Sequence, residues 1–242
     1  MSTIKPYNDD NVSKKGEVKS MFNNIAPRYD LLNHLLSFGI DKLWRRRAIK
    51  TLKAINPSHI IDVATGTGDF AIKAHSMLNC KVTGTDLSAG MLEVAKQKVA
   101  DKGLADMIEL QEADSEQLPF SDNTFDAVTV AFGVRNYENL DKGLTEMARV
   151  IKPGARMVIL EFSKPTSFPF KQIYTFYFKN ILPTMGGAIS HDKKAYEYLP
   201  QSVLAFPDGE EFEAHMITAG VKPVERISQT FGIATIYVGE KK

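Results

Sequence analysis

Two glycines and two acidic residues are spaced as in a site for a nucleotide-like ligand. Gly66 and Gly68 form a short turn after an apolar run that ends at Val63, and a helix-like sequence follows. Glycine permits backbone angles and close approaches that a Cβ atom would block. A strand, a glycine turn and a helix in this order bring such a ligand against the carboxyl end of a parallel sheet. The stretch 60–71 therefore predicts a nucleotide site, and the nearby acids indicate which ligand it takes.

Asp86 and Asp62 are the acids closest to this turn. Asp86 closes the next predicted strand, 18 residues after Gly68, where a carboxylate can accept two hydrogen bonds from a ribose diol. Asp62 lies inside the apolar strand, and a buried carboxylate is costly unless it is paired. The α-ammonium group of S-adenosylmethionine would pair with Asp62, directly or through water, whereas the pyrophosphate of NAD would be repelled.

Two further features favour S-adenosylmethionine over NAD. Asp114 follows the third predicted strand, where an acid can hold the exocyclic amine of adenine, with a helix cap as the alternative. The chain ends in a hairpin rather than in a second nucleotide-binding half. An NAD-dependent dehydrogenase remains the weaker alternative, and titrations with NADH and with S-adenosylmethionine separate the two.

The elements that must position these residues alternate between strand and helix, which implies right-handed crossovers and a parallel sheet. The expected strands are 60–63, 81–86, 107–110, 125–131 and 156–162, with helices at 89–100 and 140–150. A helix at 210–219 then precedes a hairpin of strands 222–227 and 232–239. The predicted fold class is α/β: a Rossmann-like, mostly parallel seven-stranded sheet with a C-terminal antiparallel hairpin and helices on both faces.

Two segments do not fit this alternation. The amphipathic segment at about 18–45 and the aromatic-rich segment at about 164–205 read as caps on a single domain, 1–242. Long insertions at the carboxyl end of a sheet tend to carry substrate contacts. Residues 1–15 are expected to form a mobile tail. The basic run 45–47 is interpreted as a solvated helix face, with an anion-binding or membrane-surface role as the alternative.

The composition excludes several classes of function. The chain has 242 residues, 43% of them hydrophobic, and its net charge of +1 gives no case for nucleic-acid binding. The single cysteine cannot form an internal disulfide, and no cysteine cluster or paired-histidine motif indicates a metal site. No signal-peptide run and no membrane-spanning stretch is present. We expect a cytoplasmic protein that can meet the inner face of a membrane.

Three motifs resemble those of the class I methyltransferases, and within them the family that C-methylates the quinone ring in menaquinone and ubiquinone biosynthesis. The motifs are 29–33 through 37–39 to Trp44, then 131–136, and 149–154 through 161–163. The resemblance covers nearly the whole chain, from Val18 onward. The chain departs from the family pattern twice: Asp41 stands where a histidine is usual, and Ala155 where a glycine is usual.

The resemblance implies S-adenosylmethionine as cofactor, and its contacts fall on Thr65, Asp86, Asp114 and Ser115. Residue patterns had already indicated Asp62, Gly66, Gly68, Asp86 and Asp114. The implied reaction methylates the ring of demethylmenaquinol to give menaquinol, or acts on a ubiquinol precursor. A methyltransferase for another phenolic or lipid acceptor and a non-catalytic regulator that binds S-adenosylmethionine are the alternatives.

Methylating a ring carbon requires an adjacent phenolate, so a base or a cation should lie near the methyl group. Arg135 is the first candidate to stabilise the phenolate, and Asn136 could orient the same oxygen; a loop-anchoring salt bridge is the alternative for Arg135. His34 and His191 are candidate bases in the two caps. Tyr29, Asp30, Tyr196 and Tyr198 are expected to line the acceptor pocket.

The acceptor's isoprenoid tail needs an apolar channel, which the aromatic run 168–182 could supply unless it is ordinary core. The expected partner is thus an isoprenoid quinol, with peripheral membrane contact. The oligomeric state stays open, with a homodimer as one alternative.

Overall fold

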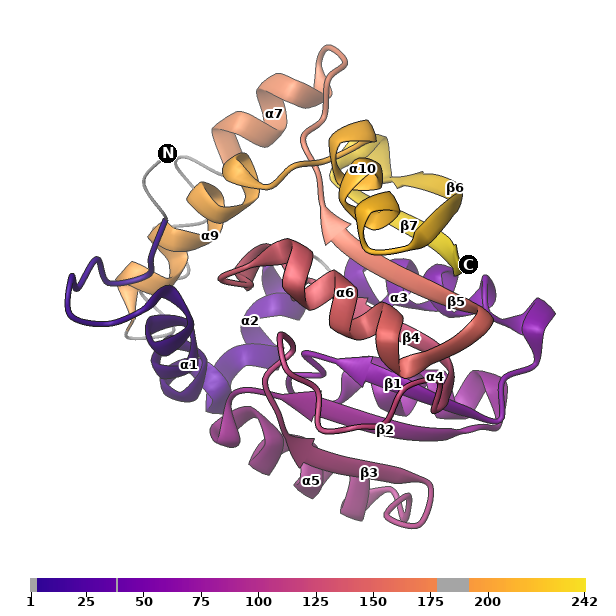
Figure 1. Ribbon diagram of the computed structural model, residues 1–242. Helices are drawn as coiled ribbons and strands as arrows, with labels where there is room; N and C mark the ends of the chain where they lie inside the picture. The colour runs from indigo at the N-terminus through magenta and orange to yellow at the C-terminus, as the bar shows by residue number, and fades with distance from the viewer. Residues whose placement is uncertain (1–3, 38, 178–191) are drawn as a thin grey trace.

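The computed structural model describes residues 4–37, 39–177 and 192–242, and Figure 1 shows their arrangement. The strands are β1 (His59–Val63), β2 (Lys81–Asp86), β3 (Ile108–Glu112), β4 (Phe125–Ala131), β5 (Ile151–Phe162), β6 (Val221–Gln229) and β7 (Ala234–Lys241). The α-helices are α1 (Lys14–Ile25), α2 (Tyr29–Leu36), α3 (Ile40–Lys50), α4 (Asp69–Leu78), α5 (Ala89–Asp101), α6 (Leu140–Val150), α7 (Phe170–Phe176), α9 (Lys193–Ala205) and α10 (Glu210–Thr218). Short 3-10 helices are η1 (Ala26–Arg28), η2 (Lys53–Ile55), η3 (Val134–Asn136) and η5 (Thr230–Gly232).

The seven strands form one sheet in the order β3-β2-β1-β4-β5-β7-β6. The first five strands pair in parallel, and β7 is antiparallel to both β5 and β6. The fold class predicted from the sequence is confirmed, including the terminal hairpin. Strand β5 begins at Ile151, earlier than expected, because Ile151 pairs with Phe125 ahead of a register shift in β4. The order reverses between β1 and β4, so the ligand crevice of such a sheet lies at their carboxyl ends.

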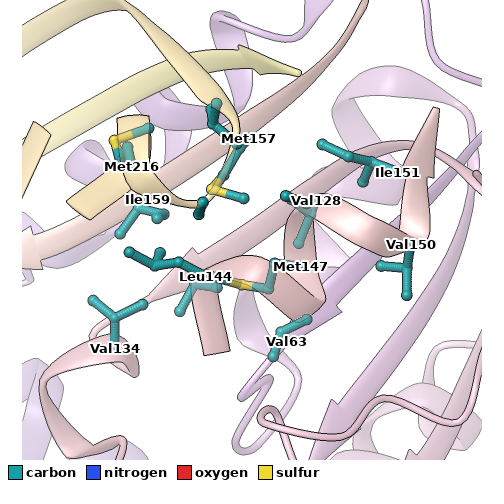
Figure 2. Packing of buried hydrophobic residues seen from close by; sticks show 14 of the residues in the cluster. Val63, Val128, Val134, Leu144, Met147, Val150, Ile151, Met157, Ile159 and Met216 are labelled. Atoms are coloured by element: carbon teal, nitrogen blue, oxygen red, sulfur yellow. The ribbon is translucent and has the colours of Figure 1, made fainter. Parts of the chain in front are cut away.

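Helices cover both faces of the sheet. On one face, α6 and α10 pack against alternate residues of the central strands, and Figure 2 shows Leu144, Met147 and Met216 among these side chains. On the other face, α3, α4 and α5 cover the residues that point the opposite way, including Ile60 and Val158. Because these strands are covered on both sides, they are apolar throughout their length.

The remaining helices lie beyond the sheet. In Figure 1, α1, α9 and α7 follow one another along the left side of the molecule. Residues 4–13 join this group, because the buried Glu17 carboxylate accepts hydrogen bonds from the backbone N–H groups of Tyr7, Asn8 and Asp9 at 2.5–3.1 Å. The expectation of a mobile tail is therefore wrong for these residues. Within the described residues, no helix combines the length and apolar character needed to cross a bilayer.

Candidate active site: two cavities that share a wall

The turns after β1 and β4 meet where the strand order reverses. Ala64 and Phe132 both adopt the left-handed region, with φ of 53° and 62°, which non-glycine residues rarely do. A Cβ atom on Gly133 would lie 2.7 Å from the Cβ atom of Ala64, so only glycine fits between the two turns. Such backbone strain persists only where the surroundings enforce it, and it clusters at functional sites.

The glycine turn after β1 is fixed to the end of β2. The Gly66 N–H donates to Asp86 Oδ2 at 2.8 Å, and the Ser88 N–H donates to Asp86 Oδ1 at 2.8 Å. Burial raises the pKa of the Asp86 carboxyl to about 6, although these backbone donors oppose the shift. The Leu87 N–H is a third backbone donor to this carboxylate. Because a carboxylate has about four lone-pair sites, Asp86 can still accept a hydrogen bond from a diol.

The smaller of two cavities opens above these strand ends, with a volume of about 80 Å³. Its floor comes from the residues that end or follow the parallel strands: Ala64, Gly66, Asp86, Leu87, Ala113, Asp114, Ser115, Ala131 and Phe132. Helix α1 covers it with Lys15, Val18, Lys19 and Phe22. Gly68 lies outside this lining. It begins α4 with φ 80°, and an added Cβ would meet Ala95 at 3.2 Å, so its role is to pack α4 against α5.

Asp114 holds the α1 cover in place. Its Oδ2 accepts from Lys15 Nζ at 2.7 Å, and its Oδ1 accepts from the Glu116 N–H at 2.9 Å. Lys19 pairs with Glu112 at 2.6 Å one turn further along α1. An adenine amine that reached Asp114 would therefore meet a carboxylate already paired with lysine.

Asp62 lies beneath the turn, 1% exposed, and both of its oxygens accept hydrogen bonds from threonine. Thr129 Oγ1 donates to Oδ1 and Thr65 Oγ1 donates to Oδ2, each at 2.6 Å. Burial raises the pKa of the Asp62 carboxyl to about 6. Neither Asp62 nor the predicted contact Thr65 is part of the lining of either cavity.

The larger cavity, about 280 Å³, lies between α1, α2, α3, α7 and α9. Phe22, Tyr29, Phe132 and Asn136 line both cavities and form their common wall. Most of the remaining lining is apolar and comes from Met21, Ile25, Ile40, Trp44, Phe162, Phe170, Ile173, Tyr174, Tyr177, Ala195, Tyr196, Tyr198, Leu199 and Ile233. Such a lining suits an aromatic ring with a long hydrocarbon substituent.

Arg135 lines the larger cavity and is also a loop anchor. Its side chain is 7% exposed, and its Nη1 donates to Glu161 Oε1 at 3.0 Å and to the Phe132 carbonyl. Among the described residues its Nε has no hydrogen-bond partner. The Arg135 guanidinium also lies 5.5 Å from the centre of the Phe162 ring. The anchoring role and the phenolate-stabilising role are therefore compatible in this geometry.

Asn136 lies at the boundary between the cavities. Its Nδ2 donates to the Phe132 carbonyl at 3.4 Å, while its buried Oδ1 has no hydrogen-bond partner among the described residues. Buried amide oxygens are rarely left unpaired, and the exceptions call for a specific reason. A hydroxyl group of a bound ligand would supply the missing donor.

The expected acceptor residues are only partly brought together. Tyr29, Tyr196 and Tyr198 line the larger cavity. Asp30 does not, because its carboxylate accepts from Thr67 Oγ1 at 2.5 Å and from Lys98 Nζ at 2.8 Å, which ties α2 to the glycine turn and to α5. His191 and the side chain of His34 lie outside the described residues.

Sequence reasoning missed Lys15, Arg45 and Glu161, and it noted Asp41 only as a departure from the family pattern. Asp41 and Arg45 lie one helical turn apart on α3 and both line the larger cavity. Arg45 belongs to a basic run that was interpreted as solvated, and only the orientation of α3 separates it from its exposed neighbour Arg46. Glu161 entered the sequence analysis only as part of a motif. The signal that could have identified it is an acid inside an apolar run predicted to form a buried strand.

Known proteins that are similar to this chain in sequence or in fold include methyltransferases. The chain is 51% identical over 239 residues to a demethylmenaquinone methyltransferase of Bacteroides fragilis, covering 98% of this chain and 97% of the relative. It is 50% identical to a ubiquinone/menaquinone biosynthesis C-methyltransferase of Geobacter sulfurreducens, covering 95% and 91% of the two chains. A crystal structure of a SAM-dependent methyltransferase from Thermotoga maritima matches with a TM-score of 0.65 at 18% identity, over 93% of this chain and 99% of that one, which shows the shared fold. Residues 10–241 match the model of the ubiE/COQ5 methyltransferase family, and the chain belongs to that family.

Proposed function

We propose that this protein transfers the methyl group of S-adenosylmethionine to a ring carbon of demethylmenaquinol, giving menaquinol. The observation that carries the proposal is the common wall of Phe22, Tyr29, Phe132 and Asn136, which both cavities share. A donor in the smaller cavity and an acceptor in the larger, mostly apolar cavity would meet at this wall. Alignment of the two reactants and exclusion of water are the main contributions a protein can make to such a transfer.

The residues of the smaller cavity fit the cofactor. Asp86 would accept the ribose hydroxyls, and Asp114 and Ser115 would face the adenine. Thr65, which donates to Asp62 Oδ2 behind the cavity lining, would contact the amino-acid moiety only after a local shift of the turn. The absence of a Cβ atom on Gly66 leaves the floor open. S-adenosylmethionine supplies a methyl group already activated by its positive sulfur, so the protein needs no further electrophile.

On the acceptor side, the chain must stabilise charge on the ring oxygen. A ring carbon becomes nucleophilic when the neighbouring hydroxyl loses its proton. Arg135 would stabilise that phenolate, and Asn136 would orient the oxygen while it is still protonated, by accepting its hydrogen bond on Oδ1. Asn136 belongs to the shared wall and Arg135 lines the larger cavity next to it, which supports these two roles.

The isoprenoid tail would leave the cavity past α7 toward a membrane surface. Tyr174 is buried against the cavity, whereas Phe168, Ile173 and Phe176 are 60–81% exposed. Peripheral contact of this surface with the bilayer is part of the proposal. Replacing Ile173 by serine should reduce sedimentation with phospholipid vesicles, and replacing Phe168 as well should reduce it further. Ile217→Ser on α10, which changes an isoleucine of similar exposure, should not. Equal sedimentation of Ile173→Ser and Ile217→Ser would contradict the membrane contact.

The test of the proposed reaction uses methyl-labelled S-adenosylmethionine with reduced demethylmenaquinone, and separately with a demethylated ubiquinol precursor. We expect label in the ring of the first acceptor, detected by mass. Label only in the second would shift the function to ubiquinol biosynthesis. Binding of S-adenosylmethionine without transfer to either would favour a regulator or a different acceptor. Tight NADH binding without S-adenosylmethionine binding would overturn the assignment.

A further inference from the structure

A second buried pair of arginine and carboxylate lines the larger cavity. Arg45 Nε lies 3.5 Å from Asp41 Oδ2, and their side chains are 12% and 5% exposed. Ser37 Oγ donates to Asp41 Oδ1 at 2.8 Å. Arg45 is therefore held by a fixed carboxylate one helical turn away. It reaches the cavity from α3, on a different segment from Arg135.

The two arginines are arranged alike around one pair of rings. The Arg45 guanidinium lies 5.5 Å from the centre of the Phe132 ring, and that of Arg135 lies 5.5 Å from the centre of the Phe162 ring. The two rings are 4.5 Å apart between centres. Two cations thus face one mostly apolar cavity, and each is neutralised by its own buried acid, Asp41 or Glu161.

This pairing leaves the Nε donor of Arg45 without a hydrogen bond in the described part of the chain. The separation of 3.5 Å from Asp41 exceeds the usual length of an N–H···O hydrogen bond, and Arg45 Nε has no hydrogen-bond partner among the described residues. A buried charge is costly, so a cation that only anchored α3 would be expected to bond more completely. Phe132, which the Arg45 guanidinium faces, also lines the smaller cavity, so Arg45 is close to the region of transfer.

We propose that Arg45 binds the second oxygen of an aromatic 1,4-diol, the one opposite the oxygen that faces Arg135. This inference rests on the proposed function, because it takes a reduced quinone ring as the acceptor. Arg135 and Asn136, beside the shared wall, take the oxygen next to the reacting carbon. The oxygens of a 1,4-diol point away from each other across the ring, so two separate cations match them. Arg45 thereby selects 1,4-diols over simple phenols.

The test measures one variant of Arg45 on two acceptors that differ in a single hydroxyl group. Arg45→Met is assayed with the reduced quinone and with an analogue that keeps the hydroxyl next to the reacting carbon but lacks the opposite one. For the full diol we expect kcat/KM to fall about tenfold to hundredfold, the scale of one hydrogen bond to a charged group. For the analogue, Arg45→Met and the wild type should be equally active. Arg46→Met, an exposed neighbour on α3, is the matched control and should leave both acceptors unaffected.

A second variant guards against misfolding, because Arg45→Met leaves Asp41 buried without its cation. The double variant Asp41→Asn with Arg45→Met removes both charges and should give the same selective loss. An equal loss on both acceptors would overturn the inference and leave Arg45 as an anchor of α3. A loss of S-adenosylmethionine affinity that matches the loss of activity would also overturn it, because Arg45 would then bind the cofactor. A wild-type protein that methylates neither quinol would instead refute the proposed function.

Discussion

The two cavities differ in what builds them. The smaller cavity is formed where parallel strands end, and its key carboxylate, Asp86, is fixed by backbone N–H groups. The larger cavity is enclosed mainly by side chains from helices in three separate parts of the chain, and each of its arginines is paired with the carboxylate of another side chain. The carboxyl ends of parallel strands can bind the same cofactor in many proteins, whereas a cavity between helices can be shaped to fit one acceptor. Substitutions in the two regions should therefore change different measured quantities.

The largest effect is expected for Arg135→Ala, which should lower the rate of methyl transfer about 10²–10³-fold, as loss of an oxyanion-stabilising donor does. S-adenosylmethionine affinity should change little, because Arg135 lines only the larger cavity. Single-turnover rates and equilibrium titration measure the two quantities. The double variant with Glu161→Gln removes the uncompensated buried acid and should show the same loss. A rate close to that of the wild type would leave Arg135 as a loop anchor alone.

Asp86→Ala should have the next largest effect, in the opposite cavity. Loss of charge-assisted hydrogen bonds to the ribose should weaken S-adenosylmethionine binding by about 1.5–3 kcal/mol. The transfer rate at saturating cofactor should stay close to that of the wild type. Calorimetric titration measures the affinity, with Asp106→Ala, an exposed change, as the control. Unchanged affinity would remove Asp86 from the ribose site.

Asp62→Asn tests the donor side of the comparison by a change in the free energy of unfolding. The pKa of the Asp62 carboxyl is raised from 3.8 to about 6 in the folded chain. Its proton therefore stabilises the fold at low pH, and this contribution is lost as the pH rises from about 4 through 6. Asparagine can bond both threonine hydroxyls without charge, so the variant should gain about 1–3 kcal/mol in free energy of unfolding at pH 7.5.

Urea unfolding of the ligand-free protein at pH 4 and at pH 7.5 measures this difference. We expect the variant and the wild type to converge at the lower pH. The variant should also bind S-adenosylmethionine more weakly at pH 7.5, because asparagine carries no charge to pair with an ammonium group. A constant stability difference between the two pH values would show that Asp62 does not titrate in this range.

The smallest effect is expected for Lys15→Met. Its ion pair with Asp114 is about a quarter exposed on each side, and pairs of this kind contribute at most about 1 kcal/mol. Lys15 also pairs with the buried Glu116 at 3.1 Å, but Glu116 keeps its hydrogen bonds from the backbone N–H groups of Glu138 and Asn139 when Lys15 is removed. Removing Lys15 frees Asp114 for the adenine amine, so S-adenosylmethionine should bind slightly more tightly, by less than about fivefold. A tenfold loss of affinity would instead show that Lys15 itself holds the cofactor.

The sheet and the smaller cavity could be predicted because their determinants are local in the sequence. The apolar strands, the turn at Gly66 and the acid at Asp86 lie within one continuous stretch, and the alternation of elements fixes where strand ends meet. Asp114 could be placed for the same reason, since it follows β3 directly.

The larger cavity could not be predicted in the same way, because the rotation of each capping helix decides which of its residues line the cavity. Arg45 faces inward while its neighbour Arg46 is exposed, and Asp30 turns toward Lys98 although the adjacent Tyr29 lines both cavities. Residue type and spacing do not distinguish these neighbours. The prediction of Arg135 came from its place after β4, which is a feature of the sheet and not of the caps.

The most direct test of the division between donor and acceptor cavities is single-turnover methyl transfer to reduced demethylmenaquinone, measured against S-adenosylmethionine concentration for wild type, Asp86→Ala and Arg135→Ala. We predict that Asp86→Ala raises the half-saturating concentration with little change in the plateau rate. Arg135→Ala should lower the plateau rate with little change in half-saturation. The same shift of both quantities in both variants, or no labelled menaquinol from the wild type, would contradict the account.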